Sequence, residues 1–113
     1  MNKVILSGRI AKDLELKYTA TNNTAVVTFN LAVRKNKTDA DFIQIVAFGK
    51  TAELLNQYCK KGSSINVIGY IRTRNYDDKD GKKIYVTEIV AEDIEFASYN
   101  KQEQTEQKDE LPF

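Results

Sequence analysis

Tyrosines and arginines alternate along residues 70–76, a pattern suited to holding an unpaired nucleic-acid strand. Tyr70, Arg72, Arg74 and Tyr76 are two residues apart, so an extended strand points all four side chains to one face. Unpaired bases stack on aromatic rings at about 1–3 kcal/mol each, and any base serves because every base has a π-face. Arginine neutralises phosphate groups and also stacks. We therefore predict a stacking and phosphate-binding face on this segment.

A second pair of aromatic residues lies in the apolar segment 42–48. If this segment is a strand, Phe42 and Phe48 share one face, and the aliphatic residues at positions 43, 45 and 47 share the other. The aliphatic face fits a barrel core, so we predict that both phenylalanines are exposed for base stacking. Cross-strand aromatic pairs also stabilise sheets, and for any single residue that explanation is about as good. The combination on two strands favours binding.

Further basic residues flank these predicted strands and extend the basic track. Each is placed to contact a phosphate group of a bound strand. They are Arg34, Lys35, Lys37 and Lys50.

Composition removes most catalytic chemistry. The 113 residues contain no histidine and a single cysteine, Cys59, so no zinc site of the usual Cys/His type and no internal disulfide can form. No nucleophile–base pair or metal-ligand spacing is visible, so we expect no enzyme activity, no metal and no cofactor. A lone thiol fits a reducing cytoplasm.

Strand patterns dominate the chain, with one helix between the third and fourth strands. The predicted strands cover residues 2–16 with a bend or bulge at Gly8, 25–34, 42–48, 64–76, and 83–90 continuing at 94–97. The predicted helix covers residues 51–61, with Thr51 as N-cap and Gly62 in the left-handed C-cap position. Residues 77–81 carry the Asp-Gly signature of a hairpin turn.

This element order predicts an all-β fold with one short helix, namely the five-stranded oligonucleotide-binding (OB) barrel. Other small barrels also have five strands, so the order narrows the fold without fixing it. No apolar run approaches the roughly 20 residues of a membrane-spanning helix, and residues 1–6 resemble a strand more than a signal peptide. We therefore expect no membrane association.

Alternation also predicts what is buried. In the fourth strand Ile65, Val67, Gly69 and Ile71 form the core face. Phe29 shares the parity of its aliphatic neighbours and is assigned to the core as well. The first strand has apolar side chains on both faces around Ile5, as expected for a strand buried against a partner.

The composition changes at Ser98. Residues 98–113 hold two lysines against four acids, a net of −2, which leaves +3 on the rest of a chain whose net charge is +1. We predict a folded domain over residues 1–97 and a flexible acidic tail over 98–113. The tail ends in apolar residues next to acidic ones, and such a segment can insert into a pocket rimmed by basic residues. This tip is Asp109, Glu110, Leu111, Pro112 and Phe113. On these residues alone, a frayed terminus is the better explanation.

Several segments, in order, resemble the bacterial and phage single-stranded DNA-binding protein (SSB) family. The likeness covers residues 1 to about 97 and the ending 109–113. Its segments are 2–6 with Gly8-Arg9, 42–50, 58–63 and 69–76. The resemblance implies an OB fold, a homotetramer, no catalysis and no metal. It also implies a tip that recruits replication, recombination and repair proteins, in a bacterial cytoplasm or phage-infected host, associated with the nucleoid.

The resemblance also assigns roles to residues. It places base stacking at Phe42, Phe48 and Tyr76, whereas Tyr70 rests on periodicity alone. It places phosphate-binding charge at Lys50, Lys61, Arg72 and Arg74. Many members stack bases on tryptophan, and this chain has none, so we expect weaker stacking at each site.

The expected function is sequence-independent binding and protection of single-stranded DNA. One alternative is an OB-fold protein-interaction module of the replication machinery. Another is an RNA-binding role like that of cold-shock proteins.

Overall fold

The computed structural model describes residues 1–96, and the predicted tail with its tip at 109–113 lies outside these residues. The described residues form six strands and one helix. In chain order they are β1 (Val4–Ile10), β2 (Leu16–Tyr18), β3 (Ala25–Arg34), β4 (Ala40–Phe48), α1 (Gly49–Tyr58), β5 (Ser64–Asp77) and β6 (Lys83–Phe96).

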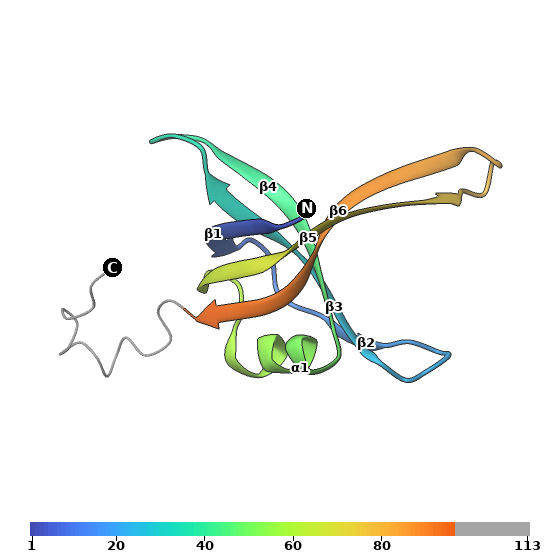
Figure 1. Cartoon of the computed structure of the whole chain (residues 1–113), viewed down its shortest axis with the longest axis horizontal. Helices are drawn as coiled ribbons and strands as arrows, with labels where there is room; N and C mark the ends of the chain where they lie inside the picture. The colour runs from blue at the N-terminus through green and yellow to red at the C-terminus, as the bar shows by residue number, and fades with distance from the viewer. Residues whose placement is uncertain (97–113) are drawn as a thin grey trace.

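Five of the strands close into a ring. They follow the order β1-β5-β6-β4-β3, and β1 pairs with β3 to complete the circle (Figure 1). The short β2 pairs with the first residues of β3, which β1 does not reach. The helix lies between β4 and β5 in the chain and covers one end of the ring. This arrangement confirms the predicted five-stranded barrel with one helix. No helix among residues 1–96 is long and apolar enough to cross a membrane.

Strand β1 closes the ring because it changes partner along its length. Residues 4–9 pair with β5, and Arg9 and Ile10 pair with β3. Gly8 lies inside this strand, and its register with β5 is unbroken, so the strand has no bulge at this residue. Its role is close approach, since a Cβ at Gly8 would lie 2.3 Å from the carbonyl oxygen of Ala32. The predicted single strand 2–16 is wrong: the chain leaves the ring after Ile10 and returns as β2.

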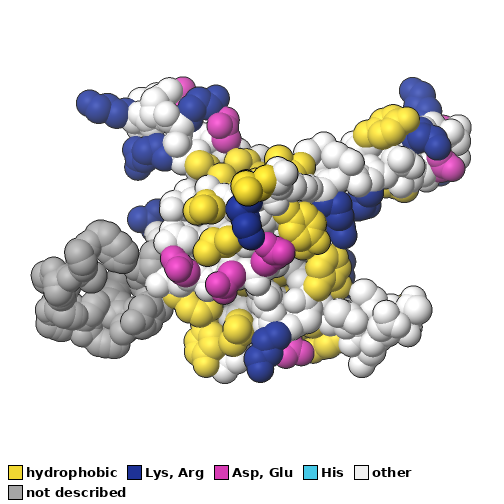
Figure 2. All heavy atoms as spheres, in the orientation of Figure 1, with side chains coloured by type: hydrophobic (Ala, Val, Ile, Leu, Met, Phe, Trp, Pro, Cys, Tyr) yellow, Lys and Arg dark blue, Asp and Glu magenta, His cyan; other side chains and the backbone are white. Residues whose placement is uncertain are grey.

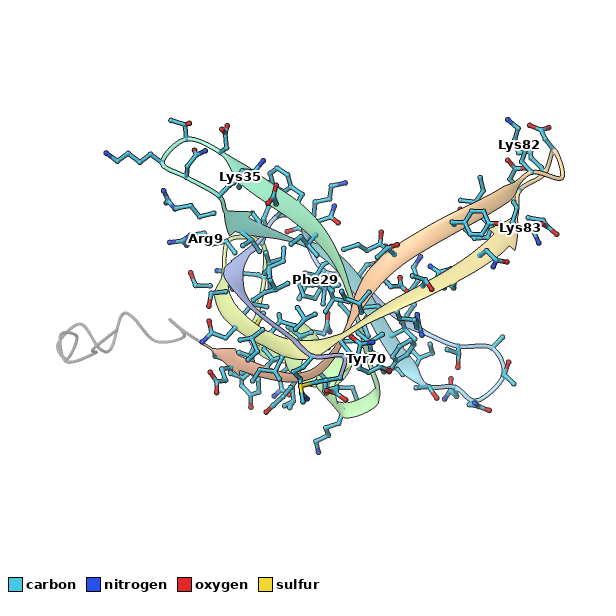
Figure 3. All side chains as sticks on the ribbon, turned by 45° about the horizontal axis from the view of Figure 1, so that its top comes forward. Arg9, Phe29, Lys35, Tyr70, Lys82 and Lys83 are labelled. Atoms are coloured by element: carbon cyan, nitrogen blue, oxygen red, sulfur yellow. The ribbon has the colours of Figure 1, made fainter. Side chains whose placement is uncertain are left out.

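The core fills the inside of the ring. It includes Leu31 from β3, Ile45 from β4 and Val67 from β5, all fully buried, and Phe29 lies inside the ring as predicted (Figure 3). Leu55 of α1 belongs to the same cluster, so the helix packs against the end of the barrel. The alternation of the strands therefore decides which side chains remain outside for binding.

The helix is shorter than predicted and begins earlier. It covers residues 49–58 with Phe48 as N-cap and no side-chain cap bond, so Thr51 lies in its first turn. It ends before Lys60 because the chain here is tied to β1: the Gly62 N–H donates to the Ile10 carbonyl at 2.8 Å. Gly62 has the predicted left-handed backbone, with φ of 92°, but in the turn that leads into β5.

Strands β5 and β6 are longer than the barrel and continue beyond it as a two-stranded ribbon (Figure 1). The predicted Asp-Gly hairpin at residues 77–81 is confirmed, with an Asp78 N–H to Lys82 carbonyl bond of 2.9 Å. Ile71, predicted in the core, is 44% exposed because β5 leaves the ring at this point. The two predicted parts of the last strand are one strand, with Glu92 as the extra residue of a bulge beside Gly69.

Candidate nucleic-acid interface

The predicted phenylalanines lie on the outside of β4. Phe42 is 66% exposed, and Phe48 is exposed on the same face six residues further along. At about 3.3 Å per residue the two rings are roughly 20 Å apart along the strand, so they belong to a track longer than one nucleotide. The residues between them, Gln44 and Val46, share this outward parity.

The predicted tyrosines and arginines of β5 lie on the outer side of the same sheet. Tyr76 is exposed on the ribbon, while Tyr70, nearer the barrel, is half-buried. In the sheet order, β6 separates β5 from β4. We use the name "outer face" for the surface over β4, β6 and β5 that carries Phe42, Phe48, Tyr70, Arg72, Arg74 and Tyr76.

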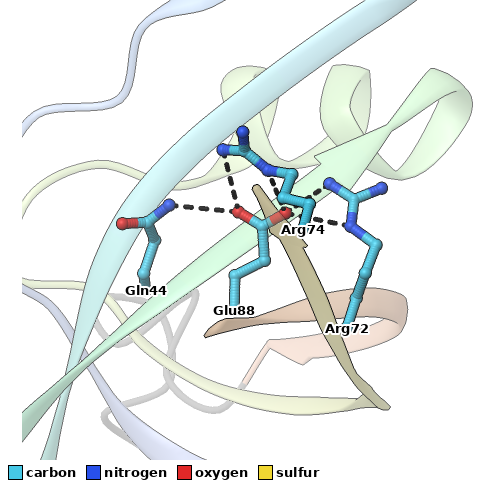
Figure 4. A network of polar contacts seen from close by, with 4 residues as sticks. All are labelled: Gln44, Arg72, Arg74 and Glu88. Carbon is cyan, nitrogen blue, oxygen red and sulfur yellow. Dashed lines mark hydrogen bonds and ion pairs between the residues drawn. The ribbon is translucent and has the colours of Figure 1, made fainter. Parts of the chain in front are cut away.

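A buried carboxylate lies in the middle of the outer face. Glu88 of β6 is the cross-strand partner of Arg72. It is 2% exposed, and among residues 1–96 it is the one charged residue that is buried. Its Oε2 accepts from Arg72 Nε at 2.9 Å, from Arg72 Nη2, and from Arg74 Nε at 3.0 Å (Figure 4). Its Oε1 accepts from Gln44 Nε2 at 3.1 Å and from Arg74 Nη2 at 3.5 Å.

The arginines keep Glu88 ionised. Burial alone would raise the pKa of Glu88, but the hydrogen bonds and charges of Arg74 and Arg72 outweigh burial and hold the pKa below its usual 4.5. The Glu88 hydrogen bond, and then its charge, raises the pKa of Arg74. The group therefore carries two positive charges and one negative charge at neutral pH.

The ion-pair group also contacts an aromatic ring. The guanidinium carbon of Arg72 lies 5.4 Å from the centroid of the Phe48 ring. At this distance the cation is attracted by the ring's negative face. Arg72 therefore joins the predicted phosphate contacts on β5 to the predicted stacking residue on β4.

The remaining predicted basic residues lie around this centre. Lys50 is exposed in the first turn of α1, and Lys61 is exposed in the turn before β5, at the opposite end of that strand from Arg72. The end of β3, the start of β4 and the loop between them form a projection that we call the β3–β4 arm. Lys35 forms an ion pair with Asp41 at 3.1 Å near the end of this arm (Figure 3). Arg34 and Lys37 line a cavity of about 440 Å³ together with Arg9 and Asp39.

Both arms end in clusters of charged side chains. Figure 2 shows lysine and arginine side chains together with acidic ones at the far ends of the β3–β4 arm and the β5–β6 ribbon, with apolar side chains between the two ends. Lys82 and Lys83 are at the end of the ribbon (Figure 3). At the end of the ribbon, residues 77–83, three lysines are balanced by three aspartates, so this end has no net charge. Its lysines can still meet phosphates, and the apolar side chains between the two ends can meet bases.

Sequence reasoning missed Glu88 and Gln44. The signal for Glu88 was present in the hairpin, because residues equally far from Asp80 face each other on β5 and β6, and this pairs position 72 with position 88. Gln44 gave no comparable signal, since its contact crosses from β4 to β6, two strands joined in parallel at only three register pairs.

The described part of the chain has no cluster of metal-ligating side chains and no reactive thiol. Residues 1–96 contain no group of three or more His, Cys, Asp or Glu side chains that could hold a metal ion. Burial raises the pKa of the Cys59 thiol to about 11, so this cysteine stays protonated and unreactive at neutral pH. What the outer face offers is stacking rings and guanidinium groups.

Comparison with known proteins identifies the family of the chain. Residues 1–97 match the model of the single-strand binding protein family. The chain is 50% identical over 104 residues to single-stranded DNA-binding protein 3 of Clostridium acetobutylicum, which covers 88% of this chain and 72% of that protein. It is 48% identical over 108 residues to the single-stranded DNA-binding protein of Clostridium tetani, with 90% and 74% covered. A third relative, single-stranded DNA-binding protein 3 of Streptococcus agalactiae, is 45% identical over 114 residues, with 95% and 82% covered.

Proposed function

The chain belongs to the single-strand binding protein family, and on this basis we propose that it binds and protects single-stranded DNA without sequence preference during replication, recombination and repair. The observation that carries the proposal is the outer face. There Arg72 lies against the Phe48 ring, and further exposed rings continue along β4 and β5. The proposal involves binding and no chemical step.

The mechanism combines two kinds of contact. Bases stack on Phe42, Phe48 and Tyr76, with Tyr70 contributing from its half-buried position. Phosphates meet the outward N–H groups of Arg72 and Arg74, and lysines at the ends of the arms extend the track. Rings accept any base and phosphates are common to every sequence, so this face reads no sequence.

A titration with oligo-dT tests this proposal. Tyrosine fluorescence should change on binding, and log K should fall linearly with log salt because bound phosphates release counterions. Matched RNA and double-stranded DNA serve as competitors, and we expect the single DNA strand to win. Absence of binding at low salt would contradict the proposal, and preference for RNA would favour the cold-shock-like alternative.

We further propose that residues 109–113 recruit partner proteins. The tip combines Leu111, Pro112 and Phe113 with adjacent acids, which fits an apolar pocket rimmed by arginine or lysine. Deleting Phe113 should abolish capture of replication and repair proteins while leaving oligo-dT binding unchanged. Unchanged capture of these proteins by the variant would contradict a recruiting role.

A homotetramer in the bacterial cytoplasm completes the proposal. Ile5 is exposed on the outside of β1. Residues 4–8 of β1 pair only with β5, so their other edge is free for a second chain. A second copy that covers Ile5 and this edge would bury apolar surface and satisfy backbone groups together.

A further inference from the structure

The buried carboxylate of Glu88 needs an explanation beyond stability. An ion is costly to bury, and a well-packed apolar residue in place of a buried ion pair is often as stable or more so. Glu88 nevertheless lies at the centre of the outer face, between Gln44 of β4 and Arg72 of β5. Its position indicates a role in how this face meets a strand.

The hydrogen bonds of Glu88 leave the arginines able to bind phosphate. Five donors converge on its two oxygens, so the carboxylate is saturated by Gln44 and the two arginines (Figure 4). Each arginine uses its Nε and Nη2 groups for Glu88, whereas a guanidinium has five N–H donors. The remaining donors of Arg72 and Arg74, whose side chains are 34% and 45% exposed, are free for a phosphate.

Glu88 also restricts where the guanidinium groups can go. Two long side chains are anchored by one acid, and Arg72 is held where it contacts the Phe48 ring. Without an anchor, each arginine would have to be ordered when the strand binds, which weakens binding. The negative charge of Glu88 has a second effect, because it offsets one of the two arginine charges before a DNA strand binds.

We propose that Glu88 is a positioning residue of the outer face: it holds Arg72 and Arg74 side by side, and as a built-in counter-anion it reduces the number of solution ions released on binding. This inference rests on the proposed function. It adds that affinity and salt dependence are set separately, affinity by the fixed geometry of the arginines and salt dependence by the charge of Glu88.

The charge is tested with Glu88→Gln, which keeps the shape and removes the anion. An uncompensated arginine attracts a counterion that a phosphate then displaces, so the slope of log K against log salt for oligo-dT should steepen by about 0.7. The matched control is Glu92→Gln, which makes the same charge change on β6 at an exposed acid paired with Lys3. The control should keep the wild-type slope.

The geometry is tested with Glu88→Asp, which keeps the charge on a shorter side chain that cannot reach both arginines. Affinity for oligo-dT should fall about threefold to tenfold at every salt concentration, with the slope unchanged. This variant retains the ion pair with one arginine, so it is readable even if Glu88→Gln does not fold. A residue needed only for stability would shift the melting temperature and neither binding readout.

The outcomes distinguish an error in the proposed function from an error in the roles of Glu88. If the wild-type chain fails to bind oligo-dT, the proposed function is wrong, and the inference falls with it. If the wild type binds but Glu88→Gln keeps the wild-type slope, or the Glu92→Gln control steepens it equally, the counter-anion role is wrong. If Glu88→Asp binds as tightly as wild type, the positioning role is wrong.

Discussion

Tyr76 and Tyr85 lie on opposite faces of one ribbon and form a matched pair for testing base stacking. Tyr76 shares the outer face with Arg72 and Arg74, whereas Tyr85, 73% exposed, pairs across the ribbon with Asn75 on the other side. Tyr76→Ala should weaken oligo-dT binding by about 1–3 kcal/mol, because one stacked base is lost. Tyr85→Ala should leave binding unchanged. Equal losses in a fluorescence titration would show that strands contact both faces.

Glu88 predicts a specific pH dependence of stability. Its pKa is held below the usual 4.5 in the folded chain, so it stabilises the fold above that pH, and this contribution is lost as the pH falls through the lowered pKa. The wild type should therefore melt at a higher temperature than Glu88→Gln near neutral pH. The difference should shrink as the pH falls below 4.5 and through the lowered pKa. A difference that stays constant in thermal melts across this range would contradict the ionised pair.

The alternation of side chains along the strands predicted the exposed rings, but it did not predict Glu88 beneath the arginines. Phe42 and Phe48 were predictable because strand parity is a local property. The alternation that placed Arg72 and Arg74 on the outer face contains no information about their neighbours. Their partner depends on hairpin register, and Gln44 depends on β4 meeting β6, a contact between residues 44 positions apart.

At the scale of elements, glycines allow strands to approach closely. A Cβ at Gly69 would lie 1.9 Å from the carbonyl oxygen of Val90, next to the bulge at Glu92. Gly69→Ala should therefore destabilise the fold by at least about 1–3 kcal/mol, as other overpacked sites do. Thr73→Ala, at an exposed position of the same strand, is the control and should change stability by less than about 0.5 kcal/mol. Equal urea midpoints for the two variants would contradict the close approach.

Element types and order were predictable, whereas several boundaries were not. The core face of β5 was assigned correctly at Ile65 and Val67, but alternation continues through Ile71, where the barrel has already ended. The end of the helix was missed for a similar reason. A hydrogen bond from Gly62 to β1 sets it, and helix propensity contains no information about that distant contact.

For the whole molecule, the exposed face of β1 predicts assembly. Ile5→Glu places a charge on the surface proposed to meet a second chain, so sedimentation at micromolar concentration should show a smaller species than the wild type. Asn22→Glu, at an exposed turn position, introduces the same charge away from β1 and should not change the assembly. Identical sedimentation of the Ile5→Glu variant and the wild type would contradict this interface.

The ribbon has a consequence for amide hydrogen exchange. At Val67, strand β5 lies between β1 and β6, but at Asn75 it has β6 as its one neighbour. Opening the ribbon disrupts fewer contacts than opening the barrel, so amides of one continuous strand should exchange quickly near Asn75 and slowly near Val67. A bound strand of DNA should slow exchange in the ribbon. Exchange measured by mass spectrometry would then map where the strand lies.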